Sequence, residues 1–265
     1  MSKNFLKDVI KYKRAVIRRD KRIEPLAVLK KKIKKLPAPR GLDNALIKGS
    51  GIIAEIKRRS PSVRGFPNAA DSIKLARDYE KNGASAISVL TDEKYFGGSV
   101  DDMQQVKRSV KLPILRKDFI IDEYQIYQSR AYGADAVLLI VSILNDEQLV
   151  RFHKIITALG MEALIEVRDE MEMMTATGRF MIRDGVIIGI NNRDLRTLKV
   201  DLDTARRLLW MVPMPMTRIV ESGIQTRRQL KQLFRLGADG FLIGGALLKA
   251  SSPGKRLRQL IYGKS

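Results

Sequence analysis

Short apolar runs alternate with amphipathic segments along most of the chain. Eight of these runs are typical of buried strands, and a segment with helical spacing of apolar residues follows each one. The expected strands cover residues 52–57, 86–90, 112–117, 136–140, 163–167, 186–190, 217–221 and 240–243. The expected helices cover residues 70–82, 99–109, 122–132, 145–159, 169–177, 201–210, 226–236 and 252–262. Their expected N-caps include Ser99, Asn145, Asp201 and Thr226, whose side chains can accept a backbone N–H.

A short motif recurs where a helical pattern ends and an apolar run begins. It reads Gly83-Ala-Ser-Ala86, Gly133-Ala-Asp-Ala136 and Gly237-Ala-Asp-Gly240. Glycine suits a helix C-cap because it tolerates positive φ, so each motif marks a helix end and a strand start. Strictly alternating strands and helices indicate a parallel sheet. Eight such units predict an α/β fold, a closed (β/α)8 TIM barrel that forms one domain over residues 46–265.

Residues 1–45 precede this barrel and predict a basic helical extension. One or two helices are expected there, ending at Pro37-Ala-Pro39. The chain carries a net charge of +21, and residues 1–40 hold 15 basic and 3 acidic side chains, a net of +12. A nucleic-acid-binding arm would explain this charge. No aromatic residue interleaves with the Lys30–Lys35 cluster, however, so a solvated helix face that attracts anionic substrates is the preferred interpretation.

The composition excludes several classes of site. The chain has no cysteine and only one histidine, His153, so disulfides, cysteine nucleophiles and multi-histidine metal sites are excluded, and no metal is expected. His153 lies in a helical pattern and is expected on a helix surface. No apolar run is long enough to span a membrane, and the charged N-terminus lacks the apolar segment of a secretory signal. A cytoplasmic protein is therefore expected.

Polar side chains gather where the expected strands end. Glu55 and Lys57 lie two residues apart on the first strand and therefore face the same side. Burying such a pair is costly unless both ions find partners, so chains keep it for ion pairing or for chemistry. Four other strands end in Leu115-Arg-Lys-Asp118, Ile165-Glu166, Ile190-Asn-Asn-Arg193 and Glu221-Ser-Gly223. Because barrels form their active sites at these ends, the set predicts acid–base catalysis on a small anionic substrate.

Small residues follow the last two strands, at Ser222-Gly223 and Gly244-Gly245. Barrels bind phosphate at this pair of loops through backbone N–H groups. Simple turn chemistry explains either loop alone, whereas the two together favour a phosphate site. The loop from Asp92 to Ser99 holds aromatic residues and a Gly-Gly pair. It is either a surface turn or a cover for a ring-bearing substrate.

Several of these segments together resemble the indole-3-glycerol phosphate synthase family, in order from about residue 5 to residue 250. The matching segments are Ala54-Glu-Ile-Lys-Arg-Arg-Ser-Pro-Ser62, Val89-Leu-Thr-Asp-Glu-Lys-Tyr-Phe-Gly-Gly-Ser99, Leu115-Arg-Lys-Asp-Phe-Ile-Ile-Asp-Glu-Tyr-Gln-Ile-Tyr127, Gly133-Ala-Asp-Ala-Val-Leu-Leu-Ile140, Ile188-Gly-Ile-Asn-Asn-Arg-Asp-Leu195 and Glu221-Ser-Gly-Ile224. The basic N-terminal helix also resembles the family's extension. One departure is Arg168, which stands where the family usually has histidine.

The resemblance implies a carboxy-lyase of tryptophan biosynthesis that needs no cofactor. Its substrate would be 1-(2-carboxyphenylamino)-1-deoxy-D-ribulose 5-phosphate, which loses carbon dioxide and water to give indole-3-glycerol phosphate. The implied catalytic residues are Glu55, Lys57, Lys117, Glu166, Asn191 and Ser222. The implied substrate-binding residues are Ser60, Pro61, Phe96, Phe119, Leu138, Ile140, Arg193 and Leu195. Gly223, Gly244 and Gly245 match the phosphate cradle.

The resemblance also implies roles for four of these catalytic side chains. Lys117 matches the general acid of ring closure, and Glu166 matches the carboxylate beside the anilino nitrogen. Glu55 matches the group that handles proton transfer in dehydration. Lys57 is expected to bind the substrate carboxylate, and the dehydration acid is left open.

Two alternatives compete with this hypothesis. A phosphoribosylanthranilate isomerase would use a cysteine–aspartate pair, which this chain cannot supply. A nucleic-acid-binding protein on a barrel scaffold would use the basic N-terminus and bind generic DNA or RNA with a steep salt dependence. The expected partner is therefore a small anionic substrate, with neither membrane nor nucleic acid. A monomer is expected, and a weak dimer is left open.

Overall fold

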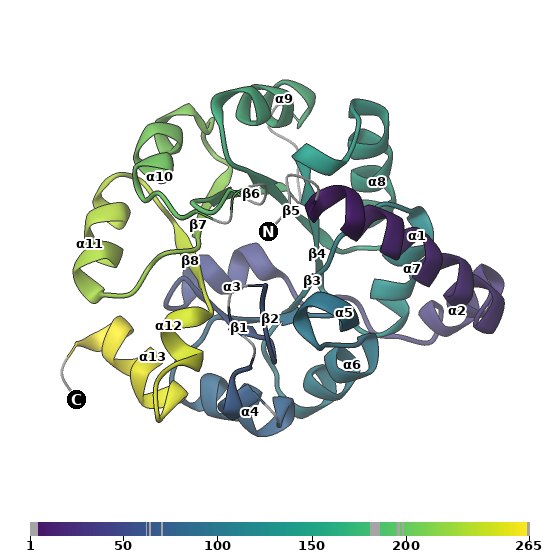
Figure 1. Ribbon diagram of the computed structural model, residues 1–265, viewed down its shortest axis with the longest axis horizontal. Coiled ribbons are helices and arrows are strands. Elements are labelled where there is room, and N and C mark those ends of the chain that lie inside the picture. Colours follow the sequence, from purple (N-terminus) through teal and green to yellow (C-terminus); the bar gives the residue numbers. More distant parts are fainter. Residues whose placement is uncertain are drawn as a thin grey trace.

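The computed structural model describes residues 5–61, 63, 65–69, 71–180, 186–194, 197 and 199–263. Its centre is a closed barrel in which eight parallel strands follow one another in chain order (Figure 1). The strands are β1 (Ile52–Ile56), β2 (Ala86–Leu90), β3 (Ile114–Lys117), β4 (Ala136–Ile140), β5 (Glu162–Val167), β6 (Val186–Asn191), β7 (Thr217–Glu221) and β8 (Gly240–Ile243). The predicted (β/α)8 barrel is confirmed.

Most of the helices surround the sheet as an outer ring, whereas α1 (Phe5–Ile23) and α3 (Leu42–Lys48) lie at its two ends (Figure 1). The other helices are α2 (Leu26–Ile33), α4 (Ser72–Lys81), α5 (Glu93–Phe96), α6 (Val100–Ser109), α7 (Glu123–Ala131), α8 (Asp146–Ala158), α9 (Glu170–Phe180), α10 (Asp203–Leu208), α11 (Arg227–Arg235), α12 (Gly245–Leu248) and α13 (Pro253–Tyr262). The described residues also form the 3₁₀ turns η1 (Pro67–Ala69), η2 (Val141–Ile143) and η3 (Leu209–Met211).

Local signals placed most of the element ends correctly. The side chains of Ser99, Asn145 and Thr226 each accept a backbone N–H at the start of a helix, as expected of N-caps. The glycines of the recurring motif lie at positive φ, with 93° at Gly83 and 92° at Gly133, because a residue without Cβ makes this turn at little cost.

Two local expectations were wrong. The N-cap of α10 is Leu202 rather than Asp201, because the helix begins at Asp203. The Asp201 carboxylate still accepts the N–H of Asp203. His153 is buried rather than exposed, and its ring packs against Phe180 of the neighbouring α9 with 4.8 Å between centroids. Periodicity had placed His153 on the wrong face because α9 covers that side of α8.

Side-chain alternation along the strands produces two cores. Residues that point outward pack beneath the helices in one large cluster. Residues that point inward fill the barrel, with Ile53, Leu115, Leu164, Ile219 and Leu242 in a second cluster. This inner cluster also includes Leu42 and Leu46 of α3, so α3 closes the N-terminal end of the barrel.

The N-terminal extension, for which one or two basic helices were expected, contains α1 and α2. Helix α1 reaches over the barrel rim, with its first turn toward the mouth and Val9 buried in the inner cluster (Figure 1). Its far end is fixed by Tyr124 of α7, whose hydroxyl donates to the carbonyl oxygens of Asp20 and Glu24 at 3.0 and 2.8 Å. The extension is therefore part of the wall around the mouth.

Candidate active site

The candidate site lies at the C-terminal ends of the strands, one step beyond the inner apolar cluster. Because inward residues recur every second position, Ile53 is followed by Glu55, Leu115 by Lys117, and Leu164 by Glu166. The same alternation places Asn191 and Glu221 at the ends of β6 and β7, where the two residues are paired in register. The closed sheet thus converts five separate strand ends into one polar ring.

Lys117 is the centre of this ring. Its Nζ lies 2.9 Å from Oε2 of Glu166 and 2.8 Å from Oε2 of Glu221. Burial alone would lower the pKa of Lys117, but the carboxylates of Glu166, Glu221 and Glu55 outweigh it and raise the pKa well above its ordinary value. Lys117 is therefore held as an ammonium ion inside the barrel.

At Glu221, in contrast, burial has a larger effect on the pKa than the neighbouring lysine. Burial raises the pKa of Glu221 to about 7, against the lowering effect of Lys117 and with a further rise from Glu166. Gly189 on β6 leaves the room for this carboxylate, since a Cβ there would lie 2.6 Å from Oε1 of Glu221. Glu221 is thus a buried acid that titrates near neutral pH beside a permanent cation.

Glu55 and Lys57 meet as their spacing predicted. The Lys57 ammonium forms an ion pair with the Glu55 carboxylate, and Glu55 is buried while Lys57 is partly exposed. Gly244 of the next loop packs against Glu55 so closely that a Cβ at this position would collide with the carboxylate. The glycine after β8 is therefore needed to keep Glu55 in place.

An apolar slot opens on one side of the polar ring, with a cavity volume of about 120 Å³. The rings of Phe96 and Phe119 stand 6.3 Å apart at its edge. Its other apolar walls are Phe5, Pro61, Leu90, Leu138 and Ile140. A small slot with this aromatic and aliphatic lining suits an aromatic ring.

A second lobe of about 640 Å³ opens on the other side and is the more polar of the two. Its wall includes the loop glycines predicted to hold phosphate, Gly223, Gly244 and Gly245. Lys249 and Arg256 line it as well. A Cβ on Gly245 would meet nothing within 4 Å, so this backbone faces open space. The lobe therefore combines exposed backbone with positive charge, which suits a phosphate group.

The two lobes share the residues at their junction. Both are lined by Glu55, Lys57, Ser60, Lys117, Arg193 and Ser222. A ligand with a ring in one lobe and a phosphate in the other would place its middle atoms against Lys117. The polar ring and the two lobes therefore form a single site.

The loops after β6 and β7 hold their polar residues by local contacts. Asn191 Oδ1 accepts the backbone N–H of Arg193 at 2.9 Å. Ser222 has a φ of 66°, a left-handed conformation that is uncommon outside glycine and recurs at functional sites. The amide of Asn192 donates to the carbonyl oxygen of Ser222 at 3.0 Å and so joins the two loops.

Arg168, the departure from the family pattern, lies behind Glu166 on the loop after β5. Its guanidinium reaches Glu172 at 2.8 Å and Asp194 at 3.1 Å. Asp194 follows Arg193, so Arg168 ties the loop after β5 to the loop after β6. This residue contributes to loop order at the rim of the site.

The structure brings the predicted site residues together, apart from Leu195, which lies outside the described residues. Sequence reasoning placed Glu221 at a strand end but gave it no role. Its position two residues after Ile219, which faces the barrel interior, indicates that its side chain points inward. Sequence reasoning missed Leu90 and Phe5 in the apolar slot and Lys249 and Arg256 in the polar lobe. No local signal marks Phe5, because it enters the site only through the placement of α1.

Two further observations concern the described part of the chain. No group of three or more histidine, cysteine or acidic residues is arranged to hold a metal ion there. None of its helices combines the length and the apolar character needed to cross a membrane.

Comparison with known proteins identifies the family. The sequence model of the family described as indole-3-glycerol phosphate synthase matches residues 6–260. The chain is 39% identical to the indole-3-glycerol phosphate synthase of Alkaliphilus metalliredigens, covering 98% of both proteins. It is 40% identical to that of Parafrankia sp., covering 97% of this chain and 95% of the relative.

A solved structure shares the fold at low identity. The N-acetylmannosamine-6-phosphate 2-epimerase of Clostridium perfringens superposes with a TM-score of 0.58 at 17% identity, over 82% of this chain and 93% of its own. This likeness concerns the barrel alone. The match along nearly the whole chain, together with the ring of lysines and carboxylates at the barrel mouth, shows that the chain belongs to the indole-3-glycerol phosphate synthase family.

Proposed function

We propose that the residues at the barrel mouth convert 1-(2-carboxyphenylamino)-1-deoxy-D-ribulose 5-phosphate into indole-3-glycerol phosphate, carbon dioxide and water. The observation that carries this proposal is Lys117, held between Glu166 and Glu221 at the junction of an aromatic slot and a phosphate lobe. The substrate has a carboxylated ring at one end and a phosphate at the other. Its reacting carbons therefore fall between the two lobes.

Ring closure is the step that needs Lys117. The aryl carbon that bears the carboxylate attacks the C2 carbonyl of the ribulose chain, and negative charge develops on that oxygen. Lys117 protonates it as a general acid. Positive charge develops on the anilino nitrogen, and the carboxylate of Glu166, which lines the apolar slot together with Lys117, stabilises it. Opposite charges are thus supplied to the two ends of the forming bond.

Loss of carbon dioxide and water completes the indole. The bond from the ring to its carboxylate breaks, and its electrons restore the aromatic ring. Lys57 is the cation available to bind that carboxylate, once it exchanges its Glu55 partner for the substrate. Glu55 then takes a proton from C1 as the C2 hydroxyl leaves as water, and the electrons of the C1–H bond form the C1–C2 double bond of the indole. The acid that protonates this hydroxyl is left open between Lys57 and Glu166.

The remaining residues hold the substrate. Phe96, Phe119, Pro61, Leu138 and Ile140 enclose the ring. Asn191, Arg193, Ser60 and Ser222 position the sugar at the junction, and Gly223, Gly244 and Gly245 present backbone to the phosphate. Leu195 stays a prediction as a wall residue. No cofactor is assigned a step.

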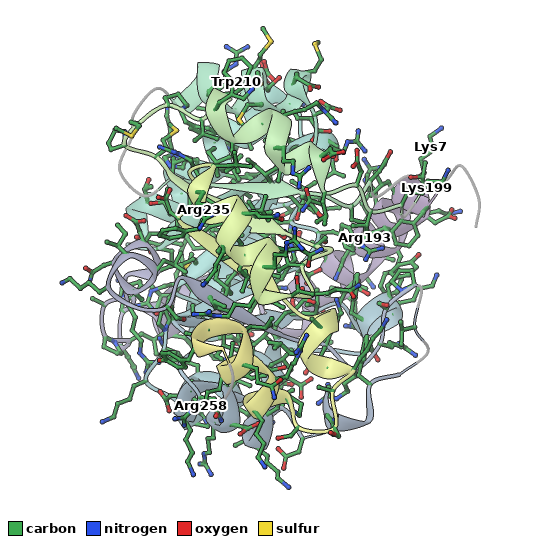
Figure 2. All side chains as sticks on the ribbon, turned by 90° about the vertical axis from the view of Figure 1, so that its left-hand side faces the viewer. Lys7, Arg193, Lys199, Trp210, Arg235 and Arg258 are labelled. Carbon is green, nitrogen blue, oxygen red and sulfur yellow. The ribbon has the colours of Figure 1, made fainter. Side chains whose placement is uncertain are left out.

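Charge around the mouth supports capture of an anion. Lys7 of α1, Arg193 and Lys199 lie along one edge of the molecule, which is the edge of the barrel mouth (Figure 2). A cationic rim raises the local concentration of a substrate that carries a carboxylate and a phosphate. The comparisons give no support to the nucleic-acid-binding alternative. The single-domain organisation, the cytoplasmic location and the monomeric state stay predictions.

The test is an assay of the wild-type chain with the carboxyphenylamino-ribulose phosphate. Indole fluorescence should grow with time, with release of one carbon dioxide per indole formed. A folded protein that binds the substrate and yields neither signal would refute the proposed function.

A further inference from the structure

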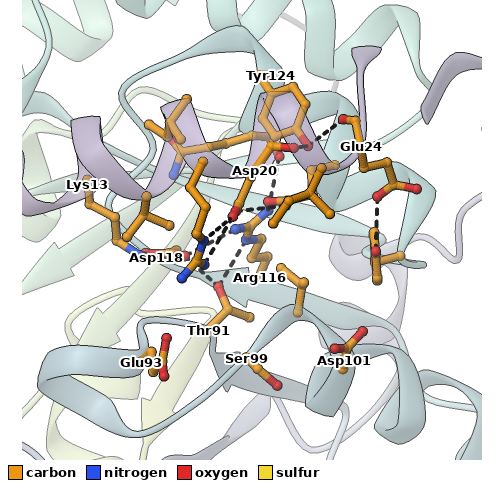
Figure 3. A pocket seen from close by; sticks show the side chains of 18 of the residues that line it. Lys13, Asp20, Glu24, Thr91, Glu93, Ser99, Asp101, Arg116, Asp118 and Tyr124 are labelled. Atoms are coloured by element: carbon orange, nitrogen blue, oxygen red, sulfur yellow. Dashed lines mark hydrogen bonds and ion pairs between the residues drawn. The ribbon is translucent and has the colours of Figure 1, made fainter. Parts of the chain in front are cut away.

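Lys13 of α1 is a charged side chain in an unusual place. It is 3% exposed, and its Nζ lies 2.9 Å from Oδ2 of Asp92. The same Nζ lies 2.6 Å from Oδ1 of Asp118 (Figure 3). Both carboxylates are buried as well. Because a buried ion costs several kcal/mol unless it is paired, the three groups depend on one another. Lys13 therefore joins the N-terminal extension to two separate loops of the barrel.

The first loop is the end of β3, where Asp118 follows Lys117. Lys117 points into the barrel, and Asp118 points out toward α1. Asp118 Oδ1 also accepts the backbone N–H of Phe119 at 2.8 Å, so the atom that contacts Lys13 also fixes the start of the Phe119 backbone. The other oxygen, Oδ2, accepts from Thr91 at 2.6 Å and from Arg116 at 3.1 Å. Lys13 is thus one of the donors to the Asp118 carboxylate, which holds the backbone next to Lys117.

The second loop follows β2 and carries the other aromatic wall. Asp92 caps α5 through Oδ1, which accepts the N–H of Tyr95 at 2.6 Å. The backbone oxygen of Asp92 accepts from Phe96 at 3.3 Å and from Gly98 at 3.1 Å. Oδ2 of Asp92 has its ion pair with Lys13 and no hydrogen-bond partner among the described side chains. Lys13 is therefore one of the contacts that hold α5 and Phe96, beside the backbone N–H groups of Arg58 and Arg59, which each donate to the carbonyl oxygen of Phe96 at 3.2 Å.

A cavity adjoins the ion pairs of Lys13 with Asp92 and Asp118. A space of about 620 Å³ lies between α1 and the loops after β2 and β3, bordered by Lys13, Asp118, Ser99, Asp101 and Tyr124 (Figure 3). Lys13 lies on α1 between two buried apolar residues, Val9 in the inner cluster and Ile17 against Tyr124. The ion pairs of Lys13 hold the middle of the helix, whereas Phe5 against Tyr95 and Tyr124 against Asp20 hold its two ends.

We propose that Lys13 is a positioning residue of the reaction, which locks the Phe96 loop to the strand end that carries Lys117 and Phe119 and so sets the width of the aromatic slot. This inference rests on the proposed function. A displacement of about 1 Å can cost a hundredfold in rate when it misplaces a catalytic group. Loss of Lys13 should therefore affect ring binding and kcat together and leave the phosphate lobe intact.

The test compares Lys13→Met with Lys11→Met. Lys11 is exposed on the same helix, so the control removes the same charge without a buried contact. We expect Lys13→Met to lower kcat/KM by roughly tenfold to a hundredfold, and Lys13→Arg to restore most of it. The pH profile should keep its shape, since Lys13 transfers no proton.

Two substrate fragments separate positioning from general damage. 2-Aminobenzoate probes the aromatic slot, and inorganic phosphate probes the other lobe. In Lys13→Met the inhibition constant of 2-aminobenzoate should rise about tenfold, while that of phosphate stays within about twofold. Equal 2-aminobenzoate affinity in wild type and variant would overturn the proposal. An equal rise in the inhibition constants of both fragments would assign Lys13 a general structural role and would also overturn the proposal.

A second variant covers the case in which Lys13→Met does not fold. Asp92→Asn retains the Lys13–Asp118 pair and removes only the ion pair that links Lys13 to α5. It should therefore weaken the binding of 2-aminobenzoate and lower kcat less than Lys13→Met does. An unchanged affinity there would sink the proposal. An inactive wild type would contradict the proposed function, whereas an active wild type with fully active variants would contradict this inference alone.

Discussion

Lys117 Nζ lies 2.8 Å from Oε2 of Glu221, although the two residues are 104 positions apart in the chain. Their strands, β3 and β7, are four places apart in the eight-stranded sheet and so stand opposite one another across the barrel. Neither strand hydrogen-bonds to the other. The ion pair therefore exists only because the sheet closes, and it places the cation of the site at the centre of the mouth.

Replacing Lys117 by Met should lower kcat by about a thousandfold or more, because it removes both the general acid and the charge opposite Glu166 and Glu221. Indole fluorescence in a single-turnover assay measures this change. Lys111→Met is the matched control, since Lys111 is exposed and remote from both lobes. A folded Lys117→Met variant that retains activity would refute the general-acid role.

Replacing Glu166 by Gln should lower kcat by about a hundredfold and leave KM within about threefold. The amide has nearly the same shape as the carboxylate but cannot stabilise positive charge on the anilino nitrogen. Steady-state kinetics separates the two constants. A rise in KM with kcat unchanged would instead assign Glu166 to binding.

The pH dependence of kcat should report Glu221, whose pKa burial raises to about 7. As the pH falls through about 7, Glu221 takes up a proton and no longer offers negative charge to Lys117, so kcat should fall. In Glu221→Gln the rate should be low throughout, and this acid limb should be absent. An identical limb in the variant would show that another group titrates.

The raised pKa of Glu221 also predicts that the free energy of unfolding changes with pH. The folded pKa of Glu221, about 7, exceeds its ordinary value of 4.5, so between these values the folded state binds more protons than the unfolded state. The contribution of Glu221 to the free energy of unfolding is therefore greatest below about pH 4.5 and is lost as the pH rises toward 7. Urea denaturation at pH 5 and pH 7 should show a smaller fall for Glu221→Gln than for wild type. A steeper fall in stability for Glu221→Gln than for wild type would contradict the raised pKa of Glu221.

Alanine at the two glycines after β8 should have different effects. A Cβ at Gly244 collides with the Glu55 carboxylate, so Gly244→Ala should lower kcat by displacing Glu55. A Cβ at Gly245 meets no protein atom and projects into the phosphate lobe, so Gly245→Ala should raise KM with little change in kcat. Kinetics of the pair, with folding checked by circular dichroism, measures both. Identical effects on kcat and KM would contradict separate roles for the two positions.

The sequence by itself determined the eight strands, most caps and the residues that end the strands. These features are local: apolar periodicity, capping side chains and glycine turns act within a few residues. The identities of Glu55, Lys57, Lys117 and Glu166 as site residues followed from their position at strand ends and from the family resemblance.

Only the tertiary structure decided which of these residues meet. Closure of the sheet joined Lys117 to Glu221, packing of α9 buried His153, and placement of α1 brought Phe5 into the slot and Lys13 onto Asp118. Each contact joins segments that are distant in the chain, and its energy depends on burial from water by a third element. Local periodicity carries no information about that third element, so these contacts could not be predicted from the pattern alone.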